Sequence, residues 1–265
     1  MLARPLLLFR DGAWARFLQV SLLFLLYTAI YEFIRYLVGP DSATAPLKHA
    51  HDVLRIERGL GLFIEPNLQR VMFDVPGLER LTVWAYKYEH LAGSILFLVW
   101  YFFKSPAKFT FVWRWFWIAH ALAIVGFWLF PLAPPRLVPE LGLIDPSAVA
   151  LANTPGWALF DHIRNEYAAM PSLHVGYPLL FATVIWFEFP GTRLRWLAWL
   201  WPAGMAFVVM ATANHYWLDA VGGAFVIAIS AYLAQRLFGT LTTPWKAAAE
   251  TGERKAARFA LKEPE

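Results

Sequence analysis

Cysteine is absent from the 265 residues of this chain, and charged residues are scarce. Without a thiol, the chain cannot use a cysteine nucleophile, a cysteine-ligated metal or a disulfide. Only 16% of the residues are charged, well below the roughly 25% usual for soluble domains. Apolar residues make up 59%, with 22 Phe and 14 Trp. They form several runs of about 20 residues, which is typical of a polytopic membrane protein.

The apolar runs predict an all-α integral membrane protein, a six-transmembrane-helix bundle with short interfacial helices. The expected membrane helices cover about residues 17–38, 79–103, 109–130, 171–189, 196–212 and 215–238. Pro202 is expected to kink the fifth of them. We expect 1–16 to be a cytoplasmic N-terminal segment, 17–238 a single membrane domain and 239–265 a cytoplasmic polar tail.

Two long segments separate the expected helices. Residues 39–80 mix charges with short apolar pieces, which predicts one or two short helices in the membrane interface, with an ordinary loop as the alternative. Residues 131–169 contain six prolines, so they cannot form one continuous helix. Ordered loops of this length are often functional.

Lys and Arg are more frequent in the short turns on the side of the two termini. The positive-inside rule therefore predicts cytoplasmic termini in a plasma or inner membrane. In that topology the end of the third helix and the starts of the fourth and sixth face the extracytoplasmic side. Arg136, His174 and His215 are then expected to converge at that surface.

Two polar clusters, 170–174 and 214–219, interrupt the apolar sequence. Ionisable groups are costly within a membrane and usually mark function there. His215 and Asp219 are four residues apart, which stacks them on one face of a helix. A carboxylate beside an imidazole fixes its tautomer and leaves the other ring nitrogen a better nucleophile or base.

The other cluster supplies an anion site. Pro171 suits the first turn of a helix, and Ser172 with the free N–H groups of that turn can bind phosphate. His174 lies one turn further and can act as a general acid. Arg136 offers a planar fork for phosphate oxygens. These groups predict phosphoryl transfer. In the alternative interpretation, the histidines only contact lipid headgroups and Arg136 only anchors the outer surface of the protein.

The segments resemble the type 2 phosphatidic acid phosphatase (PAP2) superfamily of membrane phosphatases and phosphotransferases. Its second motif, Pro-Ser-x-His, is present at 171–174. Its third motif, Ser-Arg-x5-His-x3-Asp, is present only in the His-x3-Asp half at 215–219, because Val208 and Val209 stand at the Ser-Arg positions. The first motif is reduced to the Pro-Arg pair 135–136.

This departure resembles the inositol phosphorylceramide synthase-like branch, for which six membrane helices are expected. The runs 133–137, 168–174 and 215–219 match its pattern. Asn165 and Tyr167 resemble its lead-in to the second motif, and Asn214 is a further supporting residue. The resemblance covers roughly residues 45–238.

The resemblance implies a two-step reaction on a lipid phosphate ester, with no metal and no cofactor. His215 attacks phosphorus to form a phosphohistidine, and Asp219 orients it. His174 protonates the departing alkoxide and then activates the acceptor. Arg136 and Ser172 hold the non-bridging oxygens. The missing arginine leaves one oxygen clamp unassigned.

Three residues are candidates for that clamp: Arg164, Lys87 and Asn214. The synthase-like branch favours transfer to an alcohol such as inositol or a lipid hydroxyl. The alternative is a plain lipid-phosphate or polyprenyl-(pyro)phosphate phosphatase. A transporter that uses the histidines as proton relays, or a catalytically inactive scaffold, is a remote alternative, because the chain has no internal repeat and keeps both histidines and the aspartate.

We expect the bilayer and a lipid phosphate as partners, and no nucleic acid. The oligomeric state is open. His90 and His120, inside expected helices, are interpreted as satisfied by neighbouring helices or by interfacial water.

Overall fold

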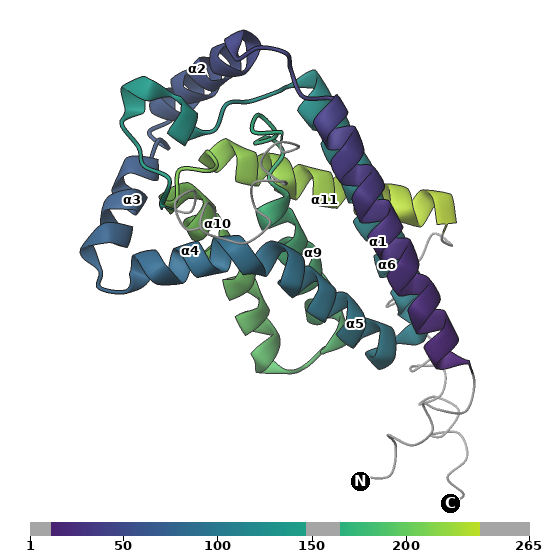
Figure 1. Cartoon of the computed structure of the whole chain (residues 1–265). Coiled ribbons are helices and arrows are strands. Elements are labelled where there is room, and N and C mark those ends of the chain that lie inside the picture. The colour runs from purple at the N-terminus through teal and green to yellow at the C-terminus, as the bar shows by residue number, and fades with distance from the viewer. Residues whose placement is uncertain (1–11, 147–164, 239–265) are drawn as a thin grey trace, which may run out of the picture.

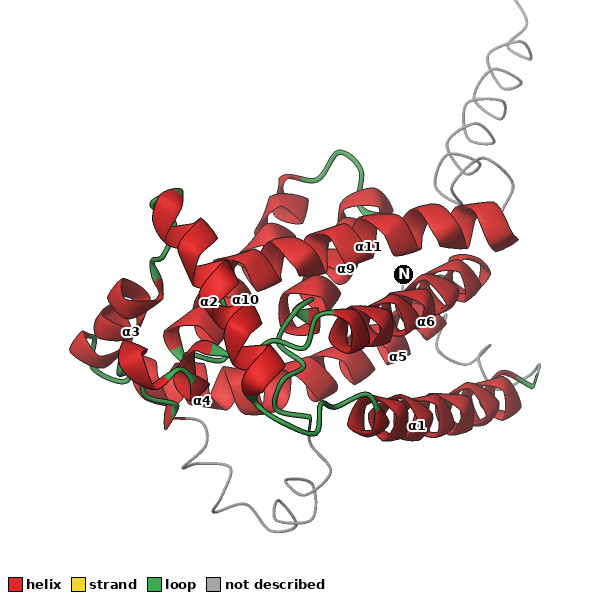
Figure 2. Ribbon diagram, turned by 90° about the horizontal axis from the view of Figure 1, so that it is seen from above, coloured by secondary structure: helices red, strands yellow, loops and turns green. Residues whose placement is uncertain are grey.

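The computed structural model describes residues 12–146 and 165–238. Its α-helices are α1 (Ala13–Leu37), α2 (Thr44–Gly59), α3 (Glu65–Asp74), α4 (Leu78–Tyr88), α5 (Ser94–Lys104), α6 (Pro106–Leu129), α9 (Leu173–Glu188), α10 (Leu200–Ala211) and α11 (Trp217–Phe238) (Figure 1). A π-helical turn, Glu89–Gly93, joins α4 to α5, and 3-10 turns cover Pro135–Leu137, Pro139–Leu141 and Arg193–Trp199. Within these two ranges there is no β-strand, so the all-α class is confirmed (Figure 2).

The bundle is built around α6, α9 and α11. Phe116 of α6 and Tyr177 and Phe181 of α9 are at most 2% exposed. Their close van der Waals packing holds the helices together, because lipid tails are as apolar as the side chains themselves. Trp115 Nε1 donates a hydrogen bond of 2.9 Å to the carbonyl oxygen of Ile227, because a buried indole N–H needs a partner. That bond ties α6 to α11.

The backbones of α9 and α11 meet at Gly223. A Cβ atom there would lie 2.3 Å from the carbonyl oxygen of Ser172, so only glycine fits. Beside this contact, the N–H of Ser172 donates to the carbonyl oxygen of Asp219 at 3.0 Å. The start of α9 is therefore fixed against the start of α11.

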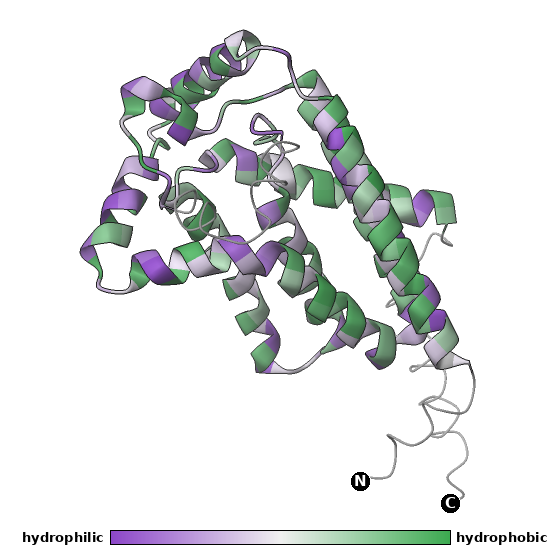
Figure 3. Cartoon of the chain, viewed as in Figure 1, coloured by the Kyte–Doolittle hydropathy of each residue, from purple (hydrophilic) through white to green (hydrophobic). Residues whose placement is uncertain are grey.

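Within the described residues, four helices are long and apolar enough to cross a membrane: Trp14–Leu37, Pro106–Leu129, Arg193–Ala211 and Trp217–Phe238. On α1, Leu18, Leu22 and Leu25 are each at least 60% exposed, as expected of a surface that faces lipid (Figure 3). These features indicate an integral membrane protein. The count of six stays a prediction, because α9 is shorter and the expected helix 79–103 is divided by the π-helical turn.

Three predicted helix boundaries were wrong. The helix expected from 171 begins at Leu173, so Pro171 precedes it instead of occupying its first turn. The helix expected from 215 begins at Trp217, and the N–H groups of the preceding loop residues Asn214 and His215 both donate to the carbonyl oxygen of Val209. The segment expected as one kinked helix changes instead from a 3-10 turn to α10 at residue 200.

Residues 39–80 contain α2 and α3, which confirms the short helices predicted there; their position in the membrane interface stays a prediction. They lie at the end of the bundle where α11 begins (Figure 1). Ala50, Val53 and Leu54 of α2 pack with Tyr216 in one buried cluster. The predicted N-terminal segment, apart from residues 12–16, and the predicted tail lie outside the described residues.

Candidate active site

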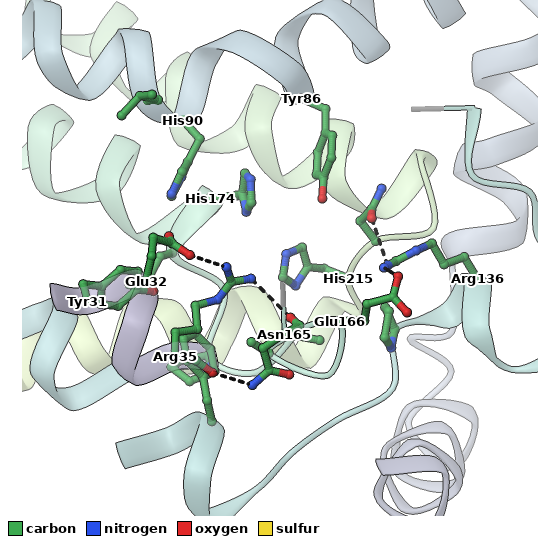
Figure 4. Close-up of a pocket in the computed structure, with 18 of the residues that line it drawn as sticks. Tyr31, Glu32, Arg35, Tyr86, His90, Arg136, Asn165, Glu166, His174 and His215 are labelled. Carbon is green, nitrogen blue, oxygen red and sulfur yellow. Dashed lines mark hydrogen bonds and ion pairs between the residues drawn. The ribbon is translucent and has the colours of Figure 1, made fainter. Parts of the chain in front are cut away.

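A cavity of about 230 Å³ lies between α1, the α4–α5 segment, the start of α9 and the loops that follow α6 and precede α11 (Figure 4). Five of the predicted site residues line it: Arg136, Asn165, His174, Asn214 and His215. They come from four separate places in the chain. The fold therefore brings the two polar clusters and the Pro-Arg pair together.

His215 and Asp219 form a buried pair at the base of the cavity. His215 Nδ1 lies 3.1 Å from Asp219 Oδ2, which also accepts a hydrogen bond of 3.0 Å from the N–H of Tyr216. Asp219 has no exposed surface, whereas His215 lines the cavity. Although His215 precedes the helix, the predicted contact forms, and the carboxylate leaves Nε2 as the nitrogen for chemistry.

His174, in the first turn of α9, faces His215 across the cavity, with 5.5 Å between the ring centroids. Its ring is stacked on Tyr86 with centroids 5.0 Å apart and packs against His90 at 4.2 Å. These contacts fix the imidazole plane. The two histidines can therefore act on opposite sides of a group bound between them.

Arg136 approaches from the turn Pro135–Leu137. Its Nε lies 3.2 Å from Asp145 Oδ2, and one terminal nitrogen donates a hydrogen bond of 3.0 Å to Asn214 Oδ1. The other terminal nitrogen lies 3.7 Å from Glu166 Oε1. The guanidinium is thus held at the cavity edge by groups from both flanking loops, with the Glu166 contact the longest.

The sequence matches the family model of the PAP2 superfamily over residues 51–233. The chain belongs to the PAP2 superfamily. It is also 29% identical, over 167 residues, to the inositol phosphorylceramide synthase catalytic subunit aur1 of Schizosaccharomyces pombe. That match covers 55% of this chain and 37% of the relative, so the chain spans little more than a third of that protein. No solved structure matches the chain.

The predicted superfamily is therefore confirmed, and the similarity to the aur1 subunit supports the predicted inositol phosphorylceramide synthase-like branch. Membership supports a lipid phosphatase or phosphotransferase kind of activity for this PAP2 protein. The roles of individual residues stay predictions, which rest on the cavity. Within residues 12–146 and 165–238, no group of three or more His, Asp or Glu side chains is arranged to hold a metal ion.

The valines at the Ser-Arg positions of the PAP2 third motif belong to the core. Val208 is 7% exposed and Val209 is fully buried, both in α10. The carbonyl oxygen of Val209 accepts hydrogen bonds from the N–H groups of Asn214 and His215, at 2.9 and 3.1 Å. Position 209 therefore supports the loop that carries the histidine and supplies no cation.

Arg35 of α1 brings a cation to the cavity that was not predicted (Figure 4). One terminal nitrogen donates a hydrogen bond of 2.9 Å to Glu32, and the other donates one of 3.3 Å to the carbonyl oxygen of Asn165. The Asn165 amide returns a 3.0 Å hydrogen bond to the carbonyl oxygen of Arg35. The available signal was an arginine at the end of an apolar helix, where a charge is rarely placed without a role.

The three residues predicted as substitutes for the missing third-motif arginine differ in where they lie. Lys87 and Asn214 line the cavity, and Arg164 lies outside the described residues. Ser172 and Tyr167 are absent from the lining. The hydroxyl of Ser172 is buried and has no hydrogen-bond partner within the described ranges, and the N–H of Tyr167 donates to Asn165 Oδ1 at 3.0 Å. Their predicted site roles stay predictions.

The histidines inside helices differ from each other. His120 is buried, and its ring nitrogens lie within hydrogen-bond distance of the Phe116 carbonyl and the Tyr177 hydroxyl, as expected for a satisfied core residue. His90, in contrast, lines the cavity against His174. The interpretation of His90 as a residue satisfied by neighbouring helices was incomplete, because its buried Nδ1 has no partner among the described side chains.

Proposed function

We propose that this protein is a membrane-embedded phosphotransferase that moves the phosphate-bearing group of a lipid to an alcohol through a phosphohistidine. The observation that carries the proposal is the cavity in which the His215–Asp219 pair faces His174. A nucleophile with a carboxylate partner, a second imidazole and cations on two sides are the components that phosphoryl transfer needs.

In the first step, His215 Nε2 attacks phosphorus, a P–N bond forms and the P–O bond to the leaving group breaks. His174 gives its proton to the departing oxygen. In the second step His174 takes a proton from the acceptor hydroxyl, whose oxygen displaces the histidine from phosphorus. Asp219 stabilises the imidazolium character of His215 in both steps.

Charge on the phosphoryl oxygens is held by Arg136 and by Arg35, which takes the place of the missing third-motif arginine. Two guanidinium groups whose positions are already fixed by neighbouring side chains stabilise a transition state more than mobile charges in water would. Because both lie at the end of the bundle where α9 and α11 begin, we propose that the substrate enters from the extracytoplasmic leaflet.

A plain lipid-phosphate phosphatase is the second candidate. The superfamily match supports hydrolysis and transfer equally, whereas the 29% identity to the aur1 subunit favours transfer. The two differ only in whether water or an alcohol attacks the phosphohistidine.

The test incubates purified protein with lipid phosphates labelled with phosphorus-32, with and without inositol and other alcohols. Label in a new phosphoester supports transfer, and label in free phosphate supports hydrolysis. His215→Ala should abolish turnover while the protein still folds, because the variant loses the carboxylate-paired nitrogen that is proposed to form the covalent intermediate. Turnover by His215→Ala would remove the nucleophile assignment.

A further inference from the structure

Two carboxylates from α2 and α3 hold the first turn of α11. Glu57 Oε1 accepts a hydrogen bond of 2.8 Å from the N–H of Leu218, and Glu65 Oε1 accepts one of 2.8 Å from the N–H of Trp217. The preceding N–H, of Tyr216, donates to Asp219. Three successive N–H groups at a helix start, which have no partners inside the helix, are thus each bound by a different carboxylate.

Both glutamates are completely buried, with 0% of their surface exposed. A buried carboxylate is costly unless it is neutralised or hydrogen-bonded on both oxygens. The outer oxygens, Glu57 Oε2 and Glu65 Oε2, have no hydrogen-bond donor within the described residues. A single proton held between the two carboxyl groups satisfies both oxygens and removes one of the two charges.

The electrostatics support this arrangement. Burial and, second to it, the neighbouring Glu65 carboxyl raise the pKa of Glu57 from 4.5 to about 8. Burial also raises the pKa of Glu65. When two carboxyl groups lie in one buried site, repulsion between their charges disfavours the state in which both are ionised. The pair therefore retains one proton to a higher pH than a single carboxyl group would.

We propose that Glu57 and Glu65 form a one-proton carboxyl pair that positions His215 and Asp219 for the reaction. This inference rests on the proposed function. The pair binds the backbone between the two residues and Asp219 itself binds the Tyr216 N–H, so a shift of this turn separates Asp219 Oδ2 from His215 Nδ1. Glu57 and Glu65 do not line the cavity, so they are positioning residues and touch no substrate.

The pH dependence follows from the groups around the pair. Asp219 on α11 and Tyr216 on the preceding loop face it, and Glu140 from the turn Pro139–Leu141 faces Tyr216. Burial raises the pKa of the Tyr216 hydroxyl, so this group stays neutral over the range considered and only the carboxyl groups around the pair can add negative charge. Between pH 4.5 and about 8 the folded pair keeps a proton that the unfolded chain loses, so its contribution to stability falls through this window and is lost above it.

The test compares turnover over pH about 6 to 10 for the wild type, Glu57→Gln and Glu57→Ala. The amide of Glu57→Gln keeps an oxygen for the Leu218 N–H and donates to Glu65, so it mimics the protonated pair. We expect Glu57→Gln to stay within about 3-fold of the wild type at neutral pH and to retain turnover above the pH where the wild type loses it. Glu57→Ala should lower kcat by about 10²-fold with little change in KM, because the reacting groups are misplaced.

The matched control is Asp74→Asn, an exposed carboxylate at the end of α3, which should leave the pH profile unchanged. An alkaline loss in Glu57→Gln identical to that of the wild type would overturn the one-proton pair. Wild-type kcat and wild-type pH profile in Glu57→Ala would overturn the positioning role.

A second readout needs no turnover. Diethyl pyrocarbonate modifies neutral imidazole, and peptide mass spectrometry gives the rate at which His215 is modified, with the exposed His51 as internal reference. We expect His215 to be modified faster in Glu57→Ala, because the imidazole loses the carboxylate that stabilises its charged form. An unchanged His215 rate would overturn the positioning role. A faster His215 rate in Glu57→Ala, combined with no turnover by the wild type, would support positioning and overturn the proposed function.

Discussion

Arg35 places a fixed positive charge beside the two histidines, and its neighbours hold it from two sides. Glu32 accepts from one terminal nitrogen and the Asn165 carbonyl from the other. We expect Arg35→Ala to lower kcat/KM by about 10²–10³-fold, as for the loss of a single donor to developing oxygen charge. Arg35→Lys should recover only part of this, because an ammonium lacks the planar fork. Steady-state turnover of a labelled lipid phosphate measures both.

Arg55 provides the matched control for that experiment. It also lies three residues from a carboxylate, Asp52, but its side chain is 76% exposed on α2. Arg55→Ala should therefore leave turnover unchanged, because an exposed ion pair contributes little. Equal kcat/KM in Arg35→Ala and Arg55→Ala would contradict the clamp assignment.

The residues that could be predicted are those whose partners are close in sequence. His215 and Asp219 form one local spacing, and His174 belongs to a four-residue motif. Arg35 could not be placed, because its contact with Asn165 spans 130 positions. Glu57 and Glu65 were missed for the same reason: their backbone partners on α11 lie more than 150 residues away. Only the fold brings such groups together.

At the scale of helices, the contact between α9 and α11 decides how the two halves of the site face each other. Gly223→Ala would place a methyl group 2.3 Å from the carbonyl oxygen of Ser172, so one helix must move. Overpacking of this kind costs about 1–3 kcal/mol. We expect a lower thermal midpoint in detergent and reduced turnover, because the bond from Ser172 to Asp219 lies beside the clash.

Gly204→Ala in α10 is the corresponding control. A Cβ at this position meets nothing within 4 Å, and alanine favours a helix over glycine by up to about 1 kcal/mol. Its thermal midpoint should be unchanged or higher. A Gly223→Ala protein as stable as Gly204→Ala would mean that the two helices do not approach as closely as described.

The helices themselves were largely predictable, because runs of apolar residues give α1, α6 and α11 directly. Their interruptions were not. The π-helical turn Glu89–Gly93 has one contact distant in sequence, in which Glu89 accepts from Trp201 Nε1 of α10, and one local contact, in which the His90 carbonyl accepts from the Ser94 hydroxyl. The late start of α11 goes with the Val209 carbonyl, whose hydrogen bonds from Asn214 and His215 hold these residues in the loop between α10 and α11.

For the whole molecule, the arrangement of the cavity in the bilayer follows from where the helices end. The end of α6 and the starts of α9 and α11 border the cavity, whereas the turn between α9 and α10 carries Arg193 and Arg195. Positive charge in short turns stays in the cytoplasm. The cavity is therefore expected on the extracytoplasmic side.

Single cysteines test this orientation directly, since the chain has no cysteine to remove. Position 166 lies at the cavity edge, and the exposed position 192 lies in the turn after α9. An impermeant thiol reagent added to intact cells should label Glu166→Cys and leave Thr192→Cys unlabelled until the membrane is permeabilised. Labelling of 192 alone would place the cavity in the cytoplasm, where the phosphate donor would have to come from the inner leaflet. Labelling of 166 alone makes the outer leaflet the source of the lipid, because neither a phosphoryl group nor its headgroup crosses the apolar span of α6 or α11 unaided.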